Sequence, residues 1–239
     1  MNNPIIVALD MANPQKALNL AEELAPLIGA FKVGKQLFIS SGPDVVHKLR
    51  ATGAKVFLDL KLNDIPNTVA KAVISATDLG VQMTTVHASG GTEMLAAAEN
   101  AAHEQAAMLR AEAPLVLGVT VLTSMDDNNL AELGIGGSVQ EQVLRLAKLA
   151  TNAGLRGLVC SPQEIKMLRA ELGGTIQLVT PGIRPEWSQA NDQKRTMTPA
   201  EAIQAGANWL VIGRPITGAA DPKSAAIRIL HTINPELVP

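Results

Sequence analysis

The chain has 239 residues, of which 47% are hydrophobic, and a formal net charge of −2 at pH 7. This length fits one α/β barrel or at most two small domains, and the weak charge offers no basic surface for nucleic acid or a membrane. With no tyrosine, three phenylalanines and two tryptophans, the chain has little material for a surface on which bases could stack.

Short apolar runs alternate with longer amphipathic segments along the chain. We predict strands over residues 5–9, 30–33, 55–60, 83–87, 115–120, 157–160, 176–180 and 209–212. We predict helices over residues 14–27, 43–51, 66–79, 93–111, 139–153, 162–172, 199–205 and 222–233. Strands that are continuously apolar and each followed by a helix are typical of a parallel sheet buried on both faces. The pattern predicts an α/β fold, a (β/α)8 TIM barrel forming a single domain over residues 1–239, rather than an open sheet.

Several features of the sequence bear on where the protein works. No apolar run approaches the roughly 18 residues that a membrane span needs. Cys160 is the single cysteine, so an internal disulfide is excluded. No basic segment of the kind that opens a signal peptide precedes the first strand. We therefore expect a cytoplasmic protein without nucleic-acid or membrane partners.

Polar side chains gather where the predicted strands end. Ionisable groups lie at or just after these ends at Asp10, Lys32, Asp59, Lys61, His87, Arg184 and Arg214. Two long connections, residues 122–137 and 181–197, leave the same rim, and Thr123 lies in the first of them. Active sites of barrels lie at this rim, so the set as a whole predicts an active site, although a single charged strand end could be an ordinary ion pair. We expect His87 to be a packed, hydrogen-bonded residue and Cys160 to be buried.

The segment from Asp59 to Thr68 carries the most chemical information. Alternation along a strand places Asp59 and Lys61 on one side, and Asp64 and Thr68 follow at the start of the next helix. Two carboxylates can ionise around one ammonium because the cation offsets their repulsion. A substrate carboxylate beside Asp59 would be repelled, whereas a carbanion left by departing CO₂ would face Lys61. The array therefore favours loss of a carboxylate.

Other motifs bear on ligands and cofactors. Gly213 and Arg214, after the last strand, suit a phosphate group, since barrels often bind phosphate after strands seven and eight. The glycine-rich segments 89–91 and 134–137 match neither a Walker A loop nor GxGxxG, so no nucleotide cofactor is expected. A metal held by Asp59, Asp64 and His87 is conceivable, but the Lys61 ammonium occupies the place a cation would take, and we expect neither metal nor other cofactor.

Residues 59–68, with the pattern Asp-x-Lys-x-x-Asp-Ile-Pro-x-Thr, resemble the signature of the orotidine 5′-phosphate decarboxylase family, bacterial type. Segments at 7–10, 31–34, 120–124, 180–184, 192–195 and 212–214 agree with that family in the same order. The resemblance implies a TIM barrel that converts orotidine 5′-phosphate to UMP and CO₂ in pyrimidine biosynthesis. It also implies a homodimer whose active sites lie at the subunit interface.

The resemblance implies roles for the residues around the reacting carbon. Lys61 would protonate C6 of the pyrimidine, and Asp59 would press on the substrate carboxylate. Asp59 would form an alternating charge network with Lys32 and Asp64. Asp64 and Thr68 would reach into the site of the partner subunit.

The rest of the nucleotide would be held by a second group of residues. Asp10 and Lys32 would hold the ribose hydroxyls, and Thr123 would contact the ring. The 5′-phosphate would be bound by Gln193, Gly213 and Arg214, with Arg184 assisting from a loop that closes over it.

Two alternatives remain open on the sequence. One is a related Mg²⁺-dependent decarboxylase or aldolase of the same barrel group that acts on sugar phosphates and shares Asp-x-Lys-x-x-Asp. The Ile-Pro-x-Thr continuation and the loop with Arg184 and Gln193 favour the pyrimidine nucleotide. The other alternative is a barrel that binds a phosphate ligand without catalysis, but a pure binder gains nothing from crowding Asp59, Lys61 and Asp64.

Overall fold

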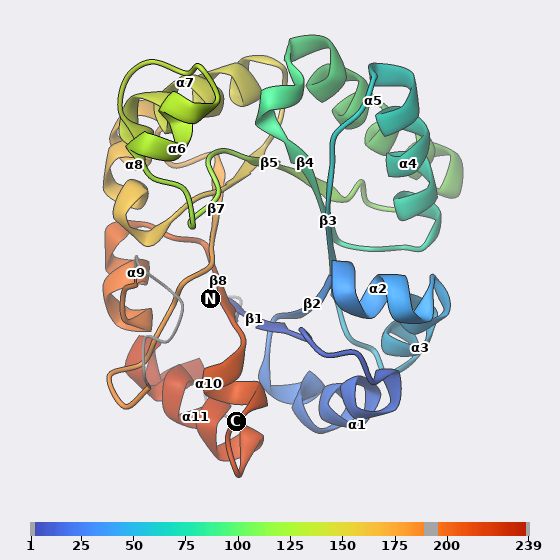
Figure 1. Ribbon diagram of the computed structural model, residues 1–239. Coiled ribbons are helices and arrows are strands. Elements are labelled where there is room, and N and C mark those ends of the chain that lie inside the picture. Colours follow the sequence, from blue (N-terminus) through green and yellow to red (C-terminus); the bar gives the residue numbers. More distant parts are fainter. Residues whose placement is uncertain (1–2, 189–195, 238–239) are drawn as a thin grey trace.

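The computed structural model describes residues 3–188 and 196–237, and in it eight parallel strands close into a barrel surrounded by helices (Figure 1). The strands are β1 (Ile5–Ala8), β2 (Ala30–Gly34), β3 (Val56–Leu62), β4 (Met83–His87), β5 (Leu115–Val119), β6 (Gly157–Val159), β7 (Gln177–Thr180) and β8 (Trp209–Ile212). Each strand pairs with its neighbours in the chain, and β8 pairs with β1 to close the ring. The predicted TIM barrel is confirmed.

The helices form the outer ring. They are α1 (Pro14–Leu24), α2 (Lys35–Ser41), α3 (Asp44–Ala51), α4 (Pro66–Asp78), α5 (Thr92–Leu109), α6 (Asp127–Glu132), α7 (Val139–Asn152), α8 (Ile165–Leu172), α9 (Pro199–Ala205), α10 (Arg214–Thr217) and α11 (Pro222–Ile233). Short 3₁₀ helices lie at η1 (Ala25–Leu27), η2 (Ala88–Gly90), η3 (Pro162–Glu164) and η4 (Pro235–Leu237).

Local signals explain where several helices begin. The Asn13 side chain accepts a hydrogen bond from the Lys16 N–H at 3.1 Å, and Pro14 occupies the first helical position of α1. Ser138 and Glu141 form a reciprocal capping box at the start of α7. Such caps satisfy backbone groups that the first turn of a helix would otherwise leave unpaired.

Besides the one-turn α10 (Arg214–Thr217), the predicted helix ranges leave out two helices, α2 and α6. Helix α2 was missed because it follows β2 without a loop and buries only Leu37, while its Ile39 is 81% exposed. Helix α6 lies inside the connection that was predicted as a loop. Six and seven residues give too few turns for a hydrophobic period to stand out.

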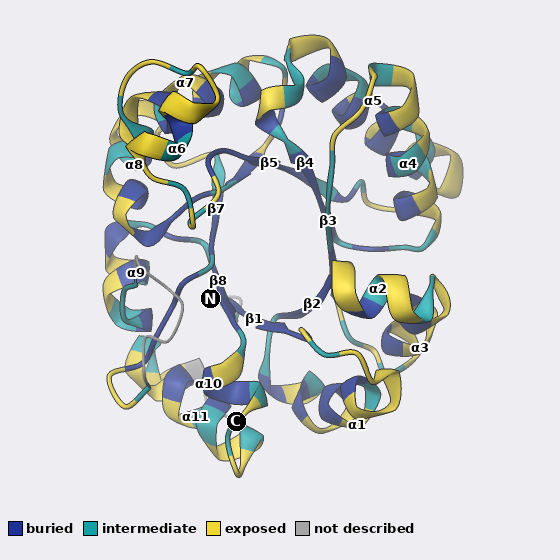
Figure 2. Cartoon of the chain, in the orientation of Figure 1, coloured by how far each residue is buried: buried dark blue, intermediate teal, exposed yellow. Residues whose placement is uncertain are grey.

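The apolar core has two parts, one on each side of the strands. Inside the barrel lie Ile6, Ala8, Ala30, Phe57, Met83, Leu117, Val179 and Val211. A larger cluster fills the space between the strands and the helices. Figure 2 shows the strands almost wholly buried and the exposed residues on the outer faces of the helices. None of the helices among residues 3–188 and 196–237 is both long and apolar enough to cross a membrane.

Arg169 on α8 fastens the N-terminal ends of β7 and β8. Its guanidinium donates hydrogen bonds of 2.6–3.1 Å to the carbonyls of Gly173, Ile176 and Gly206 and to the Asn208 side chain. The Asn208 oxygen also accepts the Leu178 N–H at 2.8 Å. One side chain thus satisfies acceptors from two connecting segments at the end of the barrel opposite the charged rim.

Replacing Arg169 by methionine should lower the free energy of unfolding by about 2–4 kcal/mol, because it removes five hydrogen bonds at once and leaves partly buried acceptors without a donor. Urea denaturation measures this loss. Lys148→Met is the matched control, since it breaks a 2.8 Å ion pair between exposed side chains, Lys148 and Glu171, and should cost less than about 1 kcal/mol. Equal losses in the two variants would contradict the role given to Arg169.

Candidate active site

The charged side chains lie directly above the apolar layer inside the barrel. Lys32 follows Ala30 by two residues on β2, and Asp59 follows Phe57 by two on β3. Because alternate residues share a face of a strand, both side chains continue inward at the C-terminal end. The site is therefore built on the strands themselves and has a packed apolar floor.

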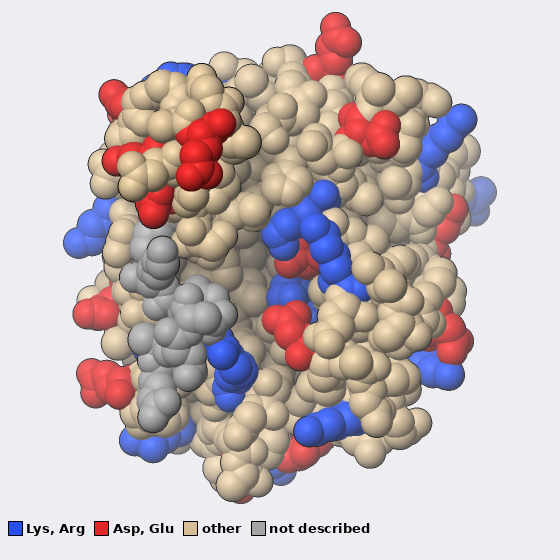
Figure 3. All heavy atoms as spheres, in the orientation of Figure 1, with Lys and Arg blue, Asp and Glu red and all other residues tan. Residues whose placement is uncertain are grey.

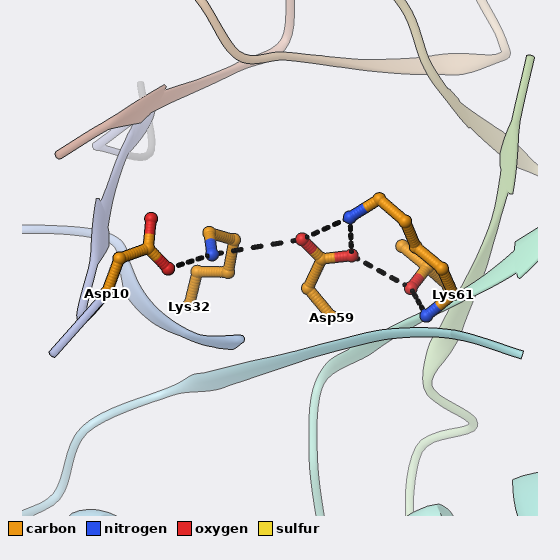
Figure 4. Close-up of polar contacts among 5 residues, drawn as sticks. Asp10, Lys32, Asp59 and Lys61 are labelled. Carbon is orange, nitrogen blue, oxygen red and sulfur yellow. Dashed lines mark hydrogen bonds and ion pairs between the residues drawn. The ribbon is translucent and has the colours of Figure 1, made fainter. Parts of the chain in front are cut away.

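Four side chains form a line of alternating charge, which Figure 4 shows as Asp10, Lys32, Asp59 and Lys61. The Lys32 ammonium lies 2.7 Å from Asp10 Oδ1 and 3.8 Å from Asp59 Oδ2. The Lys61 ammonium donates to both oxygens of Asp59, at 2.8 and 2.9 Å. The side chains of Lys32 and Asp59 are only 10% and 12% exposed. Buried charges are tolerated when each faces an opposite one, so the line holds two ammonium groups around one carboxylate.

The backbone at Lys61 departs from a regular strand. Its φ is 54°, in the left-handed region that L-residues rarely adopt. The register of β3 against β4 shifts between Leu58 and Leu62. Lys61 and Asp59 do lie together as predicted, but the strand alternation used to predict it does not hold there. A β-bulge aims the lysine instead, as bulges often do beside active sites.

Gly34 leaves room for the first ion pair of the line. A Cβ atom at this position would lie 2.9 Å from Asp10 Oδ1 and 2.9 Å from Lys32 Nζ. Any other residue would therefore displace one of these two groups. The glycine at the end of β2 is required by space, since its φ of −89° is open to every residue type.

A cavity of about 180 Å³ opens beside Asp59 and Lys61. Its walls are mostly apolar and include Val119, Val159 and Val211, with Thr123 at one side. Figure 3 shows the central hollow with acidic and basic atoms gathered along one wall. Apolar walls exclude water, so charges at their edge act on a ligand with little screening.

A second cavity of about 390 Å³ is lined by Asp10, Lys32, Arg184, Gly213 and Arg214 among others. Lys32, Pro181 and Val211 line both cavities, so the two adjoin each other along the rim. Arg184 is held at the base of its loop, where its N–H donates to the Met197 carbonyl at 2.9 Å. Two guanidinium groups and the backbone after β8 therefore face a space that suits an anionic group.

His87 and Cys160 lie at the edge of the site with altered proton affinity. Burial, then repulsion from Lys35 and Lys61, lowers the pKa of His87, so the imidazole is neutral at pH 7. Burial raises the pKa of the Cys160 thiol to about 12, which leaves it protonated and a poor nucleophile. Among residues 3–188 and 196–237, no group of three or more His, Cys, Asp and Glu side chains is placed to hold a metal ion.

Comparison of the chain with known protein families identifies the family to which it belongs. The model of the "Orotidine 5′-phosphate decarboxylase / HUMPS family" matches residues 3–229. The chain belongs to this family.

Relatives within the family resemble the chain along nearly its whole length. A protein of Idiomarina loihiensis named orotidine 5′-phosphate decarboxylase is 53% identical over 229 residues, covering 96% of this chain and 97% of the relative. One of the same name from Actinobacillus succinogenes is 49% identical over 237 residues, covering 99% of each. The crystal structure of orotidine 5′-phosphate decarboxylase from Lactobacillus acidophilus has a TM-score of 0.86 at 40% identity, covering 98% of this chain and 100% of its own.

The structure brings together most of the residues expected from the family resemblance, but not all. Asp10, Lys32, Asp59, Lys61, Thr123, Arg184, Gly213 and Arg214 line the two joined cavities. Asp64 and Thr68 line neither cavity, and both are exposed. Asp64 Oδ1 accepts the Ile65 N–H at 2.6 Å. Gln193 lies outside the described residues.

Thr85 is a residue of the site that the sequence prediction missed. Its hydroxyl lies 3.0 Å from Asp59 Oδ1 and 2.8 Å from the Lys61 backbone nitrogen. The available signal was its position two residues before His87, which places both on the inner face of β4.

Proposed function

We propose that this chain decarboxylates orotidine 5′-phosphate to UMP and CO₂, a step of pyrimidine biosynthesis. One observation carries the proposal. The Lys61 ammonium is clamped on both oxygens of Asp59, with Lys32 on the other side, beside an apolar cavity that opens onto an arginine-lined one. Membership of the family and the name of its relatives at about 50% identity support this substrate.

The two joined cavities suit the two halves of a nucleotide. We assign the 5′-phosphate to Arg184, Gly213 and Arg214, and the ribose hydroxyls to Asp10 and Lys32, which line the same cavity. Arginine binds phosphate through paired N–H groups and stays charged at every relevant pH, which favours a dianionic ligand.

The pyrimidine ring would then lie in the apolar cavity, with Thr123 beside it and its reacting carbon near Lys61. Gln193 of the 181–197 connection is retained as a phosphate ligand in this proposal.

The charge line supplies the driving force for losing the carboxylate. A substrate carboxylate about 4 Å from Asp59 is repelled by roughly 4 kcal/mol at an effective dielectric near 20. That repulsion falls as neutral CO₂ forms, while the negative charge that develops on C6 is attracted by Lys61. The site thus stabilises the transition state more than the bound substrate, which is the condition for catalysis.

The proton balance is simple in this arrangement. The bond from C6 to the carboxyl carbon breaks, its electron pair stays on C6, and CO₂ leaves. Lys61 Nζ delivers a proton to C6, and the neutral amine takes a proton back from water. Lys32, between Asp10 and Asp59, holds the Asp59 carboxylate in place through its ion pair.

We further propose a homodimer whose sites are shared. Asp64 and Thr68 are exposed, and Ile65 between them is 65% exposed. An apolar side chain so exposed, flanked by polar groups beside the mouth of the site, fits a surface that a second subunit covers. Asp64 would complete the charge network of the partner, and Thr68 would contact its substrate.

We place the enzyme in the cytoplasm, with the small-molecule substrate and a second copy of itself as its partners. The single cysteine is a free buried thiol, as suits a reducing compartment.

Purified protein should release CO₂ from orotidine 5′-phosphate and form UMP, with full activity after EDTA treatment and dialysis. The reaction is followed by the change in absorbance of the pyrimidine ring. No absorbance change at any pH would refute the proposed activity. Loss of activity in EDTA, restored by Mg²⁺, would instead favour the related metal-dependent sugar-phosphate enzymes.

Lys61→Ala should lower kcat by at least about 10³-fold, because the variant lacks both the proton donor and the cation that faces the carbanion. UMP should still bind, since the phosphate and ribose contacts remain. The matched control is Lys48→Ala, which removes an exposed lysine paired with Asp44 on α3 and should leave kcat unchanged. Turnover near that of the control would show that Lys61 is not the proton donor.

Shared sites can be tested with hybrid dimers purified through two different affinity tags. Asp64→Ala and Lys61→Ala homodimers should both be impaired, while their hybrid should recover about half the wild-type activity, because one of its two sites is intact. The control pairs a wild-type subunit with a Lys61→Ala/Asp64→Ala subunit. If sites are shared, both sites of that control are damaged and it is inactive. Half activity in the control would mean that each subunit works alone.

A further inference from the structure

Thr85 occupies a special place in the charge line. It lies on β4 two residues beyond Met83 of the inner apolar cluster, and it is fully buried. Its hydroxyl oxygen contacts Asp59 Oδ1 at 3.0 Å and the Lys61 backbone nitrogen at 2.8 Å. A residue of the neighbouring strand thereby contacts both members of the Asp59–Lys61 pair.

The direction of each hydrogen bond follows from the groups involved. The Lys61 N–H can only donate, so the Thr85 oxygen accepts from it. The single hydroxyl proton is then available to Asp59, whose ionised carboxylate can only accept. The two neighbours thus fix the orientation of the Thr85 hydroxyl, which points its proton at Asp59 Oδ1.

The bulge in β3 explains why the Lys61 N–H needs this partner. Leu58 pairs with Thr84 and Leu62 with Val86, so β3 advances from 58 to 62 while β4 advances only from 84 to 86. The intervening residues of β3 fall out of the regular ladder, and Lys61 adopts its φ of 54° there. An unpaired backbone N–H in a buried site is costly, and the Thr85 hydroxyl supplies the missing acceptor.

These contacts form a closed ring. It runs from Thr85 Oγ1 to Asp59 Oδ1, to the Lys61 ammonium, along the lysine side chain and back through its N–H to Thr85. When the ammonium turns toward a substrate, the bond from Thr85 still holds Asp59, and the bond to the Lys61 N–H still holds the backbone. The carboxylate then cannot follow the lysine.

We propose that Thr85 is a positioning residue that acts through Asp59 and Lys61 for the reaction assigned above. Its hydroxyl fixes the Asp59 carboxylate and the left-handed Lys61 backbone as one unit. This inference rests on the proposed function for its kinetic consequences, whereas its structural consequence can be measured without catalysis.

The test compares three variants with wild-type enzyme. Thr85→Val keeps the shape and removes the hydroxyl, and it should lower kcat about 10- to 100-fold, as expected for losing a hydrogen bond to a charged group. The dissociation constant for UMP should change less than about threefold, because the phosphate and ribose contacts are intact. Thr85→Ser keeps the hydroxyl and should restore kcat to within about threefold of wild type.

Thr84→Val is the matched control. Thr84 is equally buried and adjacent, but alternation points it toward the helices, and its hydroxyl has no hydrogen-bond partner among the described residues. The same substitution there should leave kcat unchanged and should not lower the melting temperature. If Thr85→Val folds poorly, Thr85→Ala is measured in the same way.

The outcomes separate the two proposals. If the wild-type enzyme has no decarboxylase activity, the proposed function is refuted, but the positioning role can still be tested by structure. In a crystal structure of Thr85→Val, we expect Lys61 to lose its left-handed conformation or the Asp59 carboxylate to turn away. Unchanged geometry in that crystal structure overturns the positioning role. So does a Thr85→Val kcat within twofold of wild type, a Thr85→Ser variant as slow as Thr85→Val, or a loss that falls on UMP affinity rather than on kcat.

Discussion

The Asp59 carboxylate is held between two ammonium groups, and the active end of the barrel is arranged around it. Lys32 approaches from β2, Lys61 from β3 itself, and Thr85 from β4, so three adjacent strands must be in register for these contacts to form. A carboxylate only 12% exposed would be unstable without these partners. The fold therefore fixes the charges before any substrate arrives, and such preorganisation makes electrostatic catalysis effective.

The two ends of the barrel differ in function: the C-terminal end carries the charged site, and the N-terminal end carries hydrogen bonds that stabilise the fold. The C-terminal end gathers the charged groups, and there the bulge in β3 gives Lys61 a strained, left-handed backbone conformation. The N-terminal end carries hydrogen bonds without such conflict, as the Arg169 contacts illustrate. Between them, the apolar cluster inside the barrel separates the ends and supports the floor of the site. Strain at the site is thus offset by packing and hydrogen bonds elsewhere.

The sequence predicted the structure well wherever the polarity of a residue alone decided whether it lies in the core or at the end of a strand. Apolar runs located all eight strands, and polar residues at their ends located the charge line. The bulge at Lys61 could not be predicted, because it depends on how β3 registers against β4. Thr85 could not be predicted for a related reason. The sequence around a threonine in an apolar strand is the same whether its hydroxyl binds a carboxylate or, like that of Thr84, has no hydrogen-bond partner among the described residues. Helix α2 lacked a hydrophobic period, so its position could not be predicted from the sequence.

Gly34 carries a consequence for the genetics of this protein. The residue has no reactive group, and its backbone conformation is open to any amino acid. Yet a single added carbon would collide with both Asp10 and Lys32. In a library of random variants, position 34 should behave like a catalytic position, with even alanine selected against, although the purified variants would remain folded. Mutational data interpreted without the structure would assign position 34 a functional side chain, whereas what is needed there is the absence of one.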